Sequence, residues 1–369
     1  MRIPVSSLRL LFSSVAAAGA LSACGGGGSD DASSTPSPPP PSVSPTCSSL
    51  RSGTYRVIVP VMASAGQYST DTMTLNAATG VTTGTDPSDV GQLTSTGNCT
   101  FNTDAGGQAV VSSAGVLVFR TVETGGTRLG IAFPEQTIVV ADLAGNWRKL
   151  GFERGDTGTY AADFGEATVD ANGAFTITRY CPDVKTCLAS IPVMNINLSP
   201  NTAGGFNLVN TTQSWTDRVF AYRSGSGDLM MVSLAGNGSF SLWTQQRTNT
   251  LPTVGTRSTT WGVYTNASLL SPAVPSLSDF TTTAVDTAAG SSTRVSEIDG
   301  HAETISINAP YPGLNFRAEG TAVATKGPNA GSNVTVREFA ALGLRGMGIS
   351  VLSLPTLSGG SYFLAVTPP

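Results

Sequence analysis

Apolar and polar residues alternate along the chain from residue 50 onward. Apolar residues take every second position in a series of short segments, for example residues 55–59, 73–75, 194–198, 240–242 and 305–307. A period of two is typical of antiparallel strands that bury one face. Dipeptides such as Asn172-Gly173 and Asn237-Gly238 favour tight turns between such segments. The sequence therefore predicts an all-β fold of antiparallel strands.

A weak internal repeat groups the predicted strands into modules. The matched segments are 53–56 with 145–148, 74–80 with 168–173, 104–107 with 202–205, and 118–120 with 221–223. A third, more diverged copy begins near Trp261. The chain is therefore predicted to hold three tandem antiparallel β modules, at 47–141, 142–250 and 251–369, each of them a small barrel or a sandwich.

Residues 1–24 carry a separate pattern. Arg2 and Arg9 give the N-terminus a positive charge, and an apolar stretch, residues 10–20, follows them. This stretch is too short to span a bilayer and has the length of the apolar part of a signal peptide. The stretch leads into Leu-Ser-Ala-Cys24, which resembles the lipobox of bacterial lipoproteins. The resemblance implies removal of residues 1–23 as a signal peptide and acylation of Cys24, which would then anchor the protein in a lipid membrane.

The position after Cys24 bears on location within the cell envelope. Gram-negative lipoproteins of the kind that this lipobox resembles stay at the inner membrane when Asp follows the cysteine. Here Gly25 follows it. The resemblance therefore implies the outer membrane, with the body of the protein facing either the periplasm or the cell surface.

The segment 24–46 forms a predicted linker behind the lipid anchor. It is rich in Gly, Ser and Pro and has no apolar periodicity, so it cannot bury a core and is expected to be disordered. Such a segment would hold the β modules away from the lipid as a tether.

Four further cysteines remain, Cys47, Cys99, Cys181 and Cys187. An even number of cysteines in an exported chain indicates disulfides, and four of them allow three pairings. We favour Cys47–Cys99 and Cys181–Cys187, because each bond then lies within one module. In the chain-entropy model, closing these loops stabilises the fold by ~4 and ~2.4 kcal/mol, respectively.

The second module opens with Leu143-Ala-Gly145-Asn-Trp147. This opening is similar to the Gly-x-Trp that begins the first strand of lipocalin-like barrels. The resemblance implies that a large aromatic side chain closes one end of the barrel, with Gly145 allowing the backbone to turn tightly. It implies no particular ligand.

Charge and residue usage argue against several kinds of function. The formal net charge of −4 argues against nucleic-acid binding through phosphates. The single histidine, His301, cannot supply a site with several His ligands, so neither a metal site nor a cofactor is predicted. His301 follows a predicted turn and is expected to be solvated or locally hydrogen-bonded. The chain has no Gly-x-Ser-x-Gly nucleophile elbow.

The leading hypothesis is a membrane-anchored binding or structural module without catalytic residues, whose partner is a glycan, a protein or a small ligand in a barrel mouth. Trp215 and Trp243 are the candidate binding residues. Trp243 falls on the strand face opposite Phe240 and Leu242, so it points outward if the face of those two residues is the core. An exposed Trp on a polar β surface can stack on a sugar or a partner side chain. The alternative is that Trp243 packs against the neighbouring module.

The alternative hypothesis is an exported hydrolase that cleaves a polysaccharide. Two carboxyl groups at a suitable separation can hydrolyse a glycosidic bond. Acidic residues gather in the second module, and the candidates are Glu153, Asp156, Asp163 and Glu166. The spacing in the sequence does not give the distances between them.

The disulfide framework makes a direct prediction. If Cys47, Cys99, Cys181 and Cys187 are all paired, mass spectrometry of the purified protein after thiol labelling should find none of the four free. Labelling of two or more of them would contradict the framework.

Overall fold

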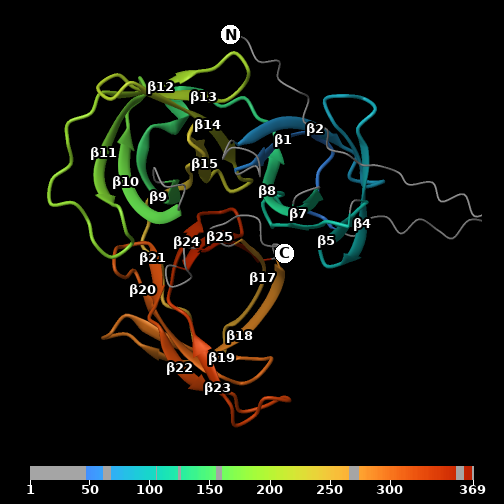
Figure 1. Ribbon diagram of the computed structural model, residues 1–369, viewed down its shortest axis with the longest axis vertical. Helices are drawn as coiled ribbons and strands as arrows, with labels where there is room; N and C mark the ends of the chain where they lie inside the picture. Colours follow the sequence, from blue (N-terminus) through green and yellow to red (C-terminus); the bar gives the residue numbers. More distant parts are fainter. Residues whose placement is uncertain are drawn as a thin grey trace, which may run out of the picture.

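The computed structural model describes residues 47–60, 68–104, 106–123, 126–154, 160–265, 274–354 and 361–367. These residues form three closed eight-stranded antiparallel barrels, arranged around a common centre (Figure 1). The prediction of an all-β protein with tandem antiparallel modules is confirmed, and the modules are barrels rather than sandwiches. The predicted signal peptide, lipid anchor and tether lie outside the described residues.

Each barrel takes its strands from one continuous part of the chain. Barrel 1 consists of β1 (Gly53–Val59), β2 (Ser69–Leu75), β3 (Val81–Thr83), β4 (Val90–Gly97), β5 (Thr100–Thr103), β6 (Gln108–Val111), β7 (Leu117–Glu123) and β8 (Gly126–Pro134). Barrel 2 consists of β9 (Gly145–Arg154), β10 (Tyr160–Val169), β11 (Ala174–Cys181), β12 (Ile196–Pro200), β13 (Phe206–Asn210), β14 (Trp215–Arg223), β15 (Leu229–Leu234) and β16 (Phe240–Gln245).

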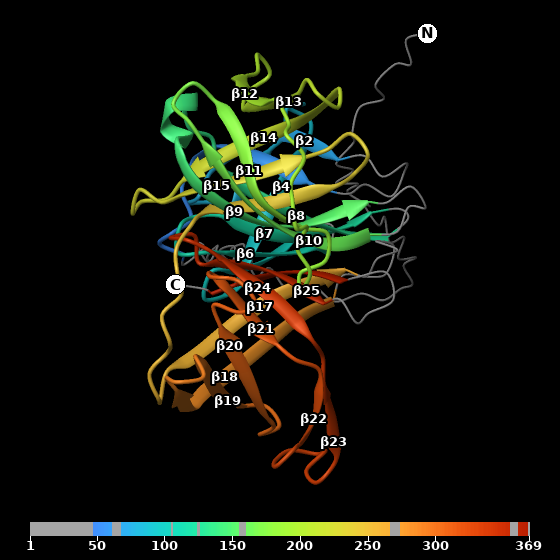
Figure 2. The same ribbon diagram turned by 90° about the vertical axis from the view of Figure 1, so that its left-hand side faces the viewer.

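Barrel 3 carries an additional hairpin. Its strands are β17 (Arg257–Thr265), β18 (Val274–Asp286), β19 (Ser291–Ser296), β20 (Ala302–Ile307), β21 (Leu314–Arg317), β24 (Phe339–Leu344), β25 (Ile349–Leu354) and β26 (Ser361–Val366). Between β21 and β24, strands β22 (Gly320–Val323) and β23 (Asn333–Val336) form a separate two-stranded sheet that projects from the barrel (Figure 2). Among the described residues, no helix is long and apolar enough to cross a membrane.

The internal repeat is only partly reflected in the topology. Residues 53–56 and 145–148 begin the first strands of barrels 1 and 2, and the turns at 76–80 and 170–173 follow the second strands. In contrast, residues 104–107 join the fifth and sixth strands of barrel 1, whereas 202–205 join the fourth and fifth strands of barrel 2. The matches in the second half of the repeat are therefore displaced by one strand, because similar turn sequences recur in every hairpin.

Both faces of many strands are buried. Inward-facing apolar residues form clusters inside barrels 1 and 2. The outer faces of all three barrels contribute to one further apolar cluster, which we name the central core. Its buried members include Ile58, Val118, Ile131 and Phe133 of barrel 1, Leu150, Phe164, Phe220, Val232 and Leu242 of barrel 2, and Leu314, Leu342, Val351 and Leu364 of barrel 3. The barrels are therefore joined through the apolar outer faces of their strands.

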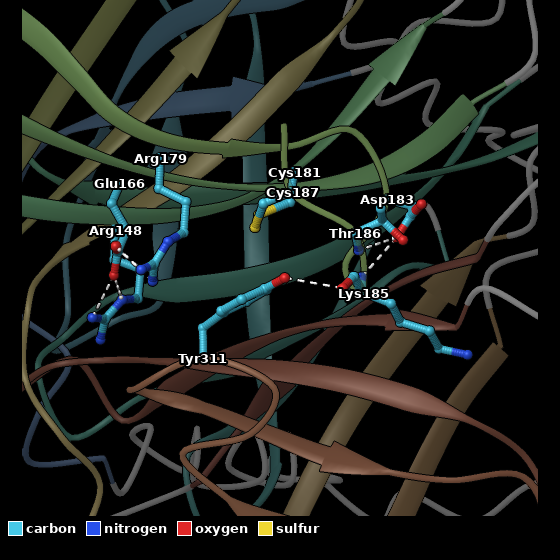
Figure 3. Close-up of a disulfide and its surroundings, with 9 residues drawn as sticks. All are labelled: Arg148, Glu166, Arg179, Cys181, Asp183, Lys185, Thr186, Cys187 and Tyr311. Atoms are coloured by element: carbon cyan, nitrogen blue, oxygen red, sulfur yellow. Dashed lines mark hydrogen bonds and ion pairs between the residues drawn. A yellow bond between two sulfur atoms is a disulfide. The ribbon is translucent and has the colours of Figure 1, made fainter. Parts of the chain in front are cut away.

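Polar contacts lock the barrels together around the central core. The hydroxyl of Tyr222 in barrel 2 donates a hydrogen bond to the carbonyl oxygen of Ala114 in barrel 1, at 2.6 Å. Tyr311 of barrel 3 stacks on Phe164 of barrel 2 with ring centroids 5.2 Å apart, and its hydroxyl donates to the carbonyl oxygen of Lys185 at 2.9 Å (Figure 3). These contacts, buried at Tyr222 and exposed between Tyr311 and Lys185, connect barrel 2 with each of its neighbours.

Both predicted disulfides are present. Cys47 joins Cys99 within barrel 1, and Cys181 joins Cys187 within barrel 2. The second bond closes the loop that carries Lys185, the residue that Tyr311 contacts from barrel 3 (Figure 3). This disulfide therefore shapes part of the contact between barrels 2 and 3.

The central core predicts a large cost for truncating a side chain on the outside of a barrel. Leu242 faces outward from barrel 2 and is 1% exposed. We expect Leu242→Ala to lower the free energy of unfolding by about 2–4 kcal/mol, because a cavity replaces packed atoms. Thr176→Ala, on an exposed outer position of the same barrel, should change it by less than about 0.5 kcal/mol. Urea unfolding measures both, and equal effects would contradict packing of the barrels through this face.

Candidate functional site

Barrel 2 encloses a cavity of about 630 Å³. Its wall is formed mainly by inward-facing residues of the barrel strands, and by residues of the loops at one end. The loop residues include Leu188, Pro192, Gln213, Gly236 and Asn237, which belong to the β11–β12, β13–β14 and β15–β16 connections. The cavity therefore lies toward one end of the barrel, which is the usual place for a ligand in a small closed barrel.

Aromatic and aliphatic side chains close the opposite end of barrel 2. Trp147 is fully buried there, and its Nε1 donates a hydrogen bond to the carbonyl oxygen of Leu143 at 2.8 Å. Phe206, Val219 and Leu229 pack in the same buried cluster. Because the indole N–H of Trp147 is hydrogen-bonded to Leu143, burial of this side chain leaves no polar atom without a partner.

A buried ion pair stands in the wall of the barrel. The Nζ of Lys149 forms an ion pair with the carboxylate of Asp163, whose side chain has no exposed surface. The Nζ also lies 3.4 Å from Glu153 Oε1. It lies 5.6 Å from the ring centroid of Tyr180 and 5.7 Å from that of Trp243. Burial lowers the pKa of Lys149, but Asp163 and Glu153 outweigh this effect and hold it above its ordinary value. Lys149 is therefore charged at neutral pH.

The pair fits inside the barrel because a neighbouring strand position lacks a side chain. Gly151 lies opposite Asp163 in the β9–β10 ladder. A Cβ at Gly151 would lie 2.6 Å from Asp163 Oδ1 and would also collide with Ser241. Substitution at Gly151 therefore displaces the carboxylate that balances the charge of Lys149.

A second carboxylate, Asp217, faces the cavity without a counter-ion. Asp217 lies opposite Leu208 in the β13–β14 ladder, and both residues line the cavity. Within the part of the chain that the structure describes, Asp217 has no ion pair and its carboxylate accepts no hydrogen bond. Burial raises the pKa of Asp217 to about 6, while Lys149 lowers it and Glu153 raises it. The carboxylate is therefore held in a site that penalises its charge.

The two tryptophans singled out from the sequence both line this cavity. Trp215 is half-buried, and its Nε1 donates to Oε1 of Gln213 at 3.2 Å. The expectation that Trp243 points outward is wrong: it is 6% exposed inside barrel 2, and its Nε1 donates to Ser233 Oγ at 3.0 Å. The apolar face of Phe240 and Leu242 is buried on the outside of the barrel, against the central core.

The four acidic candidates for hydrolysis do not form one cluster. Glu153 and Glu166 both border the cavity, but the Glu166 carboxylate is held by Arg148 at 2.7 Å and by Arg179 at 2.9 Å (Figure 3). Asp163 is paired with Lys149. Asp156 lies outside the described residues.

His301 belongs to barrel 3 and is held locally. Its Nδ1 lies 2.6 Å from Asp299 Oδ1, and its ring meets Phe280 edge-on at 5.8 Å. Nearby, Glu303 pairs with Arg294 and Arg317. Among the described residues, no group of three or more His, Cys, Asp or Glu side chains is arranged to hold a metal ion.

Sequence reasoning missed Lys149 and Asp217. Each follows a tryptophan by two residues, as Trp147-Arg-Lys149 and Trp215-Thr-Asp217. In a strand, residues two apart share a face, so each charged residue was bound to accompany its tryptophan into the barrel. This pattern was the available signal.

Comparison with known proteins gives no family. No family model matches the chain, and no curated protein matches it. Two similar solved structures are a double mutant of transferrin binding protein B from Haemophilus parasuis (9% identity, TM-score 0.20, 81% of this chain and 65% of that chain) and isotype 1 transferrin binding protein B from serogroup B Neisseria meningitidis (9% identity, TM-score 0.19, 87% and 77%). The chain thus spans less than two thirds of the first structure, and neither low TM-score carries an argument about this chain.

The raised pKa of Asp217 predicts a pH-dependent cost in stability. A carboxyl group whose pKa is higher in the folded state destabilises the fold as pH rises through that pKa, and has no such effect below the ordinary value near 4. Asp217→Asn should therefore match the parent protein at pH 4. At pH 7.5 it should be more stable by about 1 kcal/mol, which is roughly 2–4 °C in Tm.

Thermal unfolding of both proteins across this pH range tests the prediction. Asp286→Asn removes the same charge from an exposed turn of barrel 3 and is the matched control. A gain for Asp217→Asn that does not grow between pH 4 and pH 7.5 would contradict the burial of an ionised Asp217.

Proposed function

We propose that the protein is a lipid-anchored binding protein of the cell envelope that takes a small ligand into the cavity of barrel 2. The observation that carries the proposal is the cavity itself. Its volume of about 630 Å³ lies within the range of small-molecule sites, and it combines apolar walls with a few converging polar groups.

The proposed mode of binding follows from the two ends of barrel 2. Trp147 and its neighbours close one end, so a ligand would enter between the loops at the other. Trp215 and Trp243 would provide broad aromatic surfaces for its apolar part, and Ser233, Ser241 and Asn237 would provide hydrogen-bonding groups. The strands hold these groups in place, so little ordering is needed upon binding.

Binding is favoured over hydrolysis by the arrangement of the carboxylates. Hydrolysis of a glycosidic bond needs two carboxyl groups that both reach the substrate. Asp163 is fully buried against Lys149, and Glu166 is held by two arginines. Asp163 and Glu166, two of the four candidates for a hydrolase, are therefore used in ion pairs of the fold.

The envelope location rests on the sequence. The lipobox-like segment ending at Cys24 supports membrane anchoring, and residues 25–46 support a tether between the lipid and the barrels. A binding protein in this position would present its cavity to solutes of the periplasm or of the cell surface.

A neutral fluorescent probe tests the proposed cavity. N-phenyl-naphthylamine, which brightens in apolar sites, should bind the purified protein saturably. Leu208 is buried inside barrel 2 and lines the cavity, so Leu208→Trp should fill part of it and weaken binding by about tenfold or more.

The matched control places the same side chain on the outside of the same barrel. Asn197 is exposed and lies on the strand next to β13, so Asn197→Trp should leave the affinity unchanged. Absence of probe binding, or equal loss in both variants, would reject the cavity as the binding site.

A further inference from the structure

The charged groups of the barrel 2 cavity indicate which kind of small ligand it would bind. This inference rests on the proposed function of the cavity as a ligand site. Among the described residues, Lys149 is the basic residue in the cavity wall, and its charge interacts with the carboxylates of Glu153, Asp163 and Asp217. Glu166 also borders the cavity, but its carboxylate pairs with Arg148 and Arg179. Asp163 is the ion-pair partner of Lys149 and Glu153 approaches it at 3.4 Å. The positive charge of Lys149 is therefore already matched before any ligand enters.

The carboxylate of Asp217 has no ion-pair partner among the described residues. It lies in the wall of a half-buried cavity. A carboxylate removed from water without a partner is costly. A ligand that carries a positive charge would supply the missing partner and recover part of that cost.

The aromatic residues of the cavity suit the same ligand. Trp215 lies two residues before Asp217 on the same face of β14, and both side chains line the cavity. Tyr180 and Trp243 already lie beside the ammonium group of Lys149, at 5.6 and 5.7 Å from ring centroid to Nζ. Ring faces of this kind attract cations, and they also pack against flat apolar groups.

We infer that the ligand of the barrel 2 cavity is a small organic cation, an amine carried on an aromatic or other apolar body. Asp217 receives the amine, and Trp215 and Trp243 pack against the body. Lys149 does not repel the ligand, because Asp163 and Glu153 balance its charge. An anionic ligand would instead meet Asp217 and Glu153 with like charge.

Three probes that share one ring system test this inference. Naphthylmethylamine is cationic at pH 7.5, naphthalenemethanol is neutral and naphthylacetate is anionic. Isothermal titration of the purified full chain should give an affinity for the amine about tenfold or more above that for the alcohol, and no detectable binding of the acetate. The matching benzyl series repeats the comparison with a smaller body.

Asp217→Asn tests the assigned residue. The variant should lose about tenfold or more in affinity for the amine and keep its affinity for the neutral alcohol within about twofold. Asp286→Asn, which removes the same formal charge from barrel 3, should keep both affinities. Because Asp217→Asn is expected to be at least as stable as the parent protein, a loss of amine binding would not arise from unfolding.

The outcomes separate this inference from the function on which it rests. If the alcohol or the acetate binds as tightly as the amine, or if Asp217→Asn affects all probes equally, barrel 2 binds small ligands but the cationic class is wrong. If no probe of either series binds, the proposed function falls together with the inference.

Discussion

The central core is the constraint on which the rest of this structure depends. Each barrel presents an apolar outer face, and the three outer faces bury one another. A fully buried Leu, Ile, Val or Phe contributes roughly 1.5–3 kcal/mol relative to exposure, so a cluster of this size outweighs what any single contact between barrels supplies. A barrel separated from its partners would expose a large apolar patch, which soluble monomers avoid. The three barrels therefore stand as one packed unit.

The same constraint explains how far the sequence could be interpreted. Alternation predicted the strands, and Gly-containing turns predicted their antiparallel order, because both depend on local chemistry. The disulfide pairing followed from module boundaries, and the structure contains both bonds. These features need no knowledge of what covers a strand.

Which face of a strand points into its barrel was beyond the sequence. In β16, Phe240 and Leu242 alternate with Ser241 and Trp243, and both sets are buried. Period two separates the two faces but cannot say which one lines the barrel and which one meets a neighbouring barrel. The apolar pair joined the central core, so Trp243 turned inward, opposite to the expectation from an isolated module.

The cavity forms only when the eight strands of barrel 2 close into a barrel, and no local sequence pattern predicts this closure. Lys149 lies on β9 and Asp217 on β14, and the barrel wall brings both to one cavity only after all eight strands of barrel 2 have paired. The sequence could predict that each residue shares a strand face with its tryptophan neighbour. The sequence could not predict that Lys149 and Asp217 line the same cavity, because this depends on the strand order and register of the whole barrel.

The first strands of barrels 1 and 2 differ in the residues that point into the barrel. Tyr55 and Trp147 occupy matching positions, and Ile58 and Leu150, three residues later, both join the central core. The inward positions between and beyond them differ: barrel 1 has Val57 and Val59 where barrel 2 has Lys149 and Gly151.

These two exchanges act together. In barrel 1, inward space is filled by apolar groups, as where the Phe119 ring lies against Gly130 so closely that no Cβ would fit. In barrel 2, the absent side chain of Gly151 makes room for Asp163, and Asp163 in turn makes a buried Lys149 tolerable. An ion pair of this kind adds little net stability compared with the apolar packing that it replaces. Barrel 2 keeps its outer face for the central core. Its interior is apolar around Trp147, but at Lys149 and Asp163 it holds charged side chains in place of apolar ones.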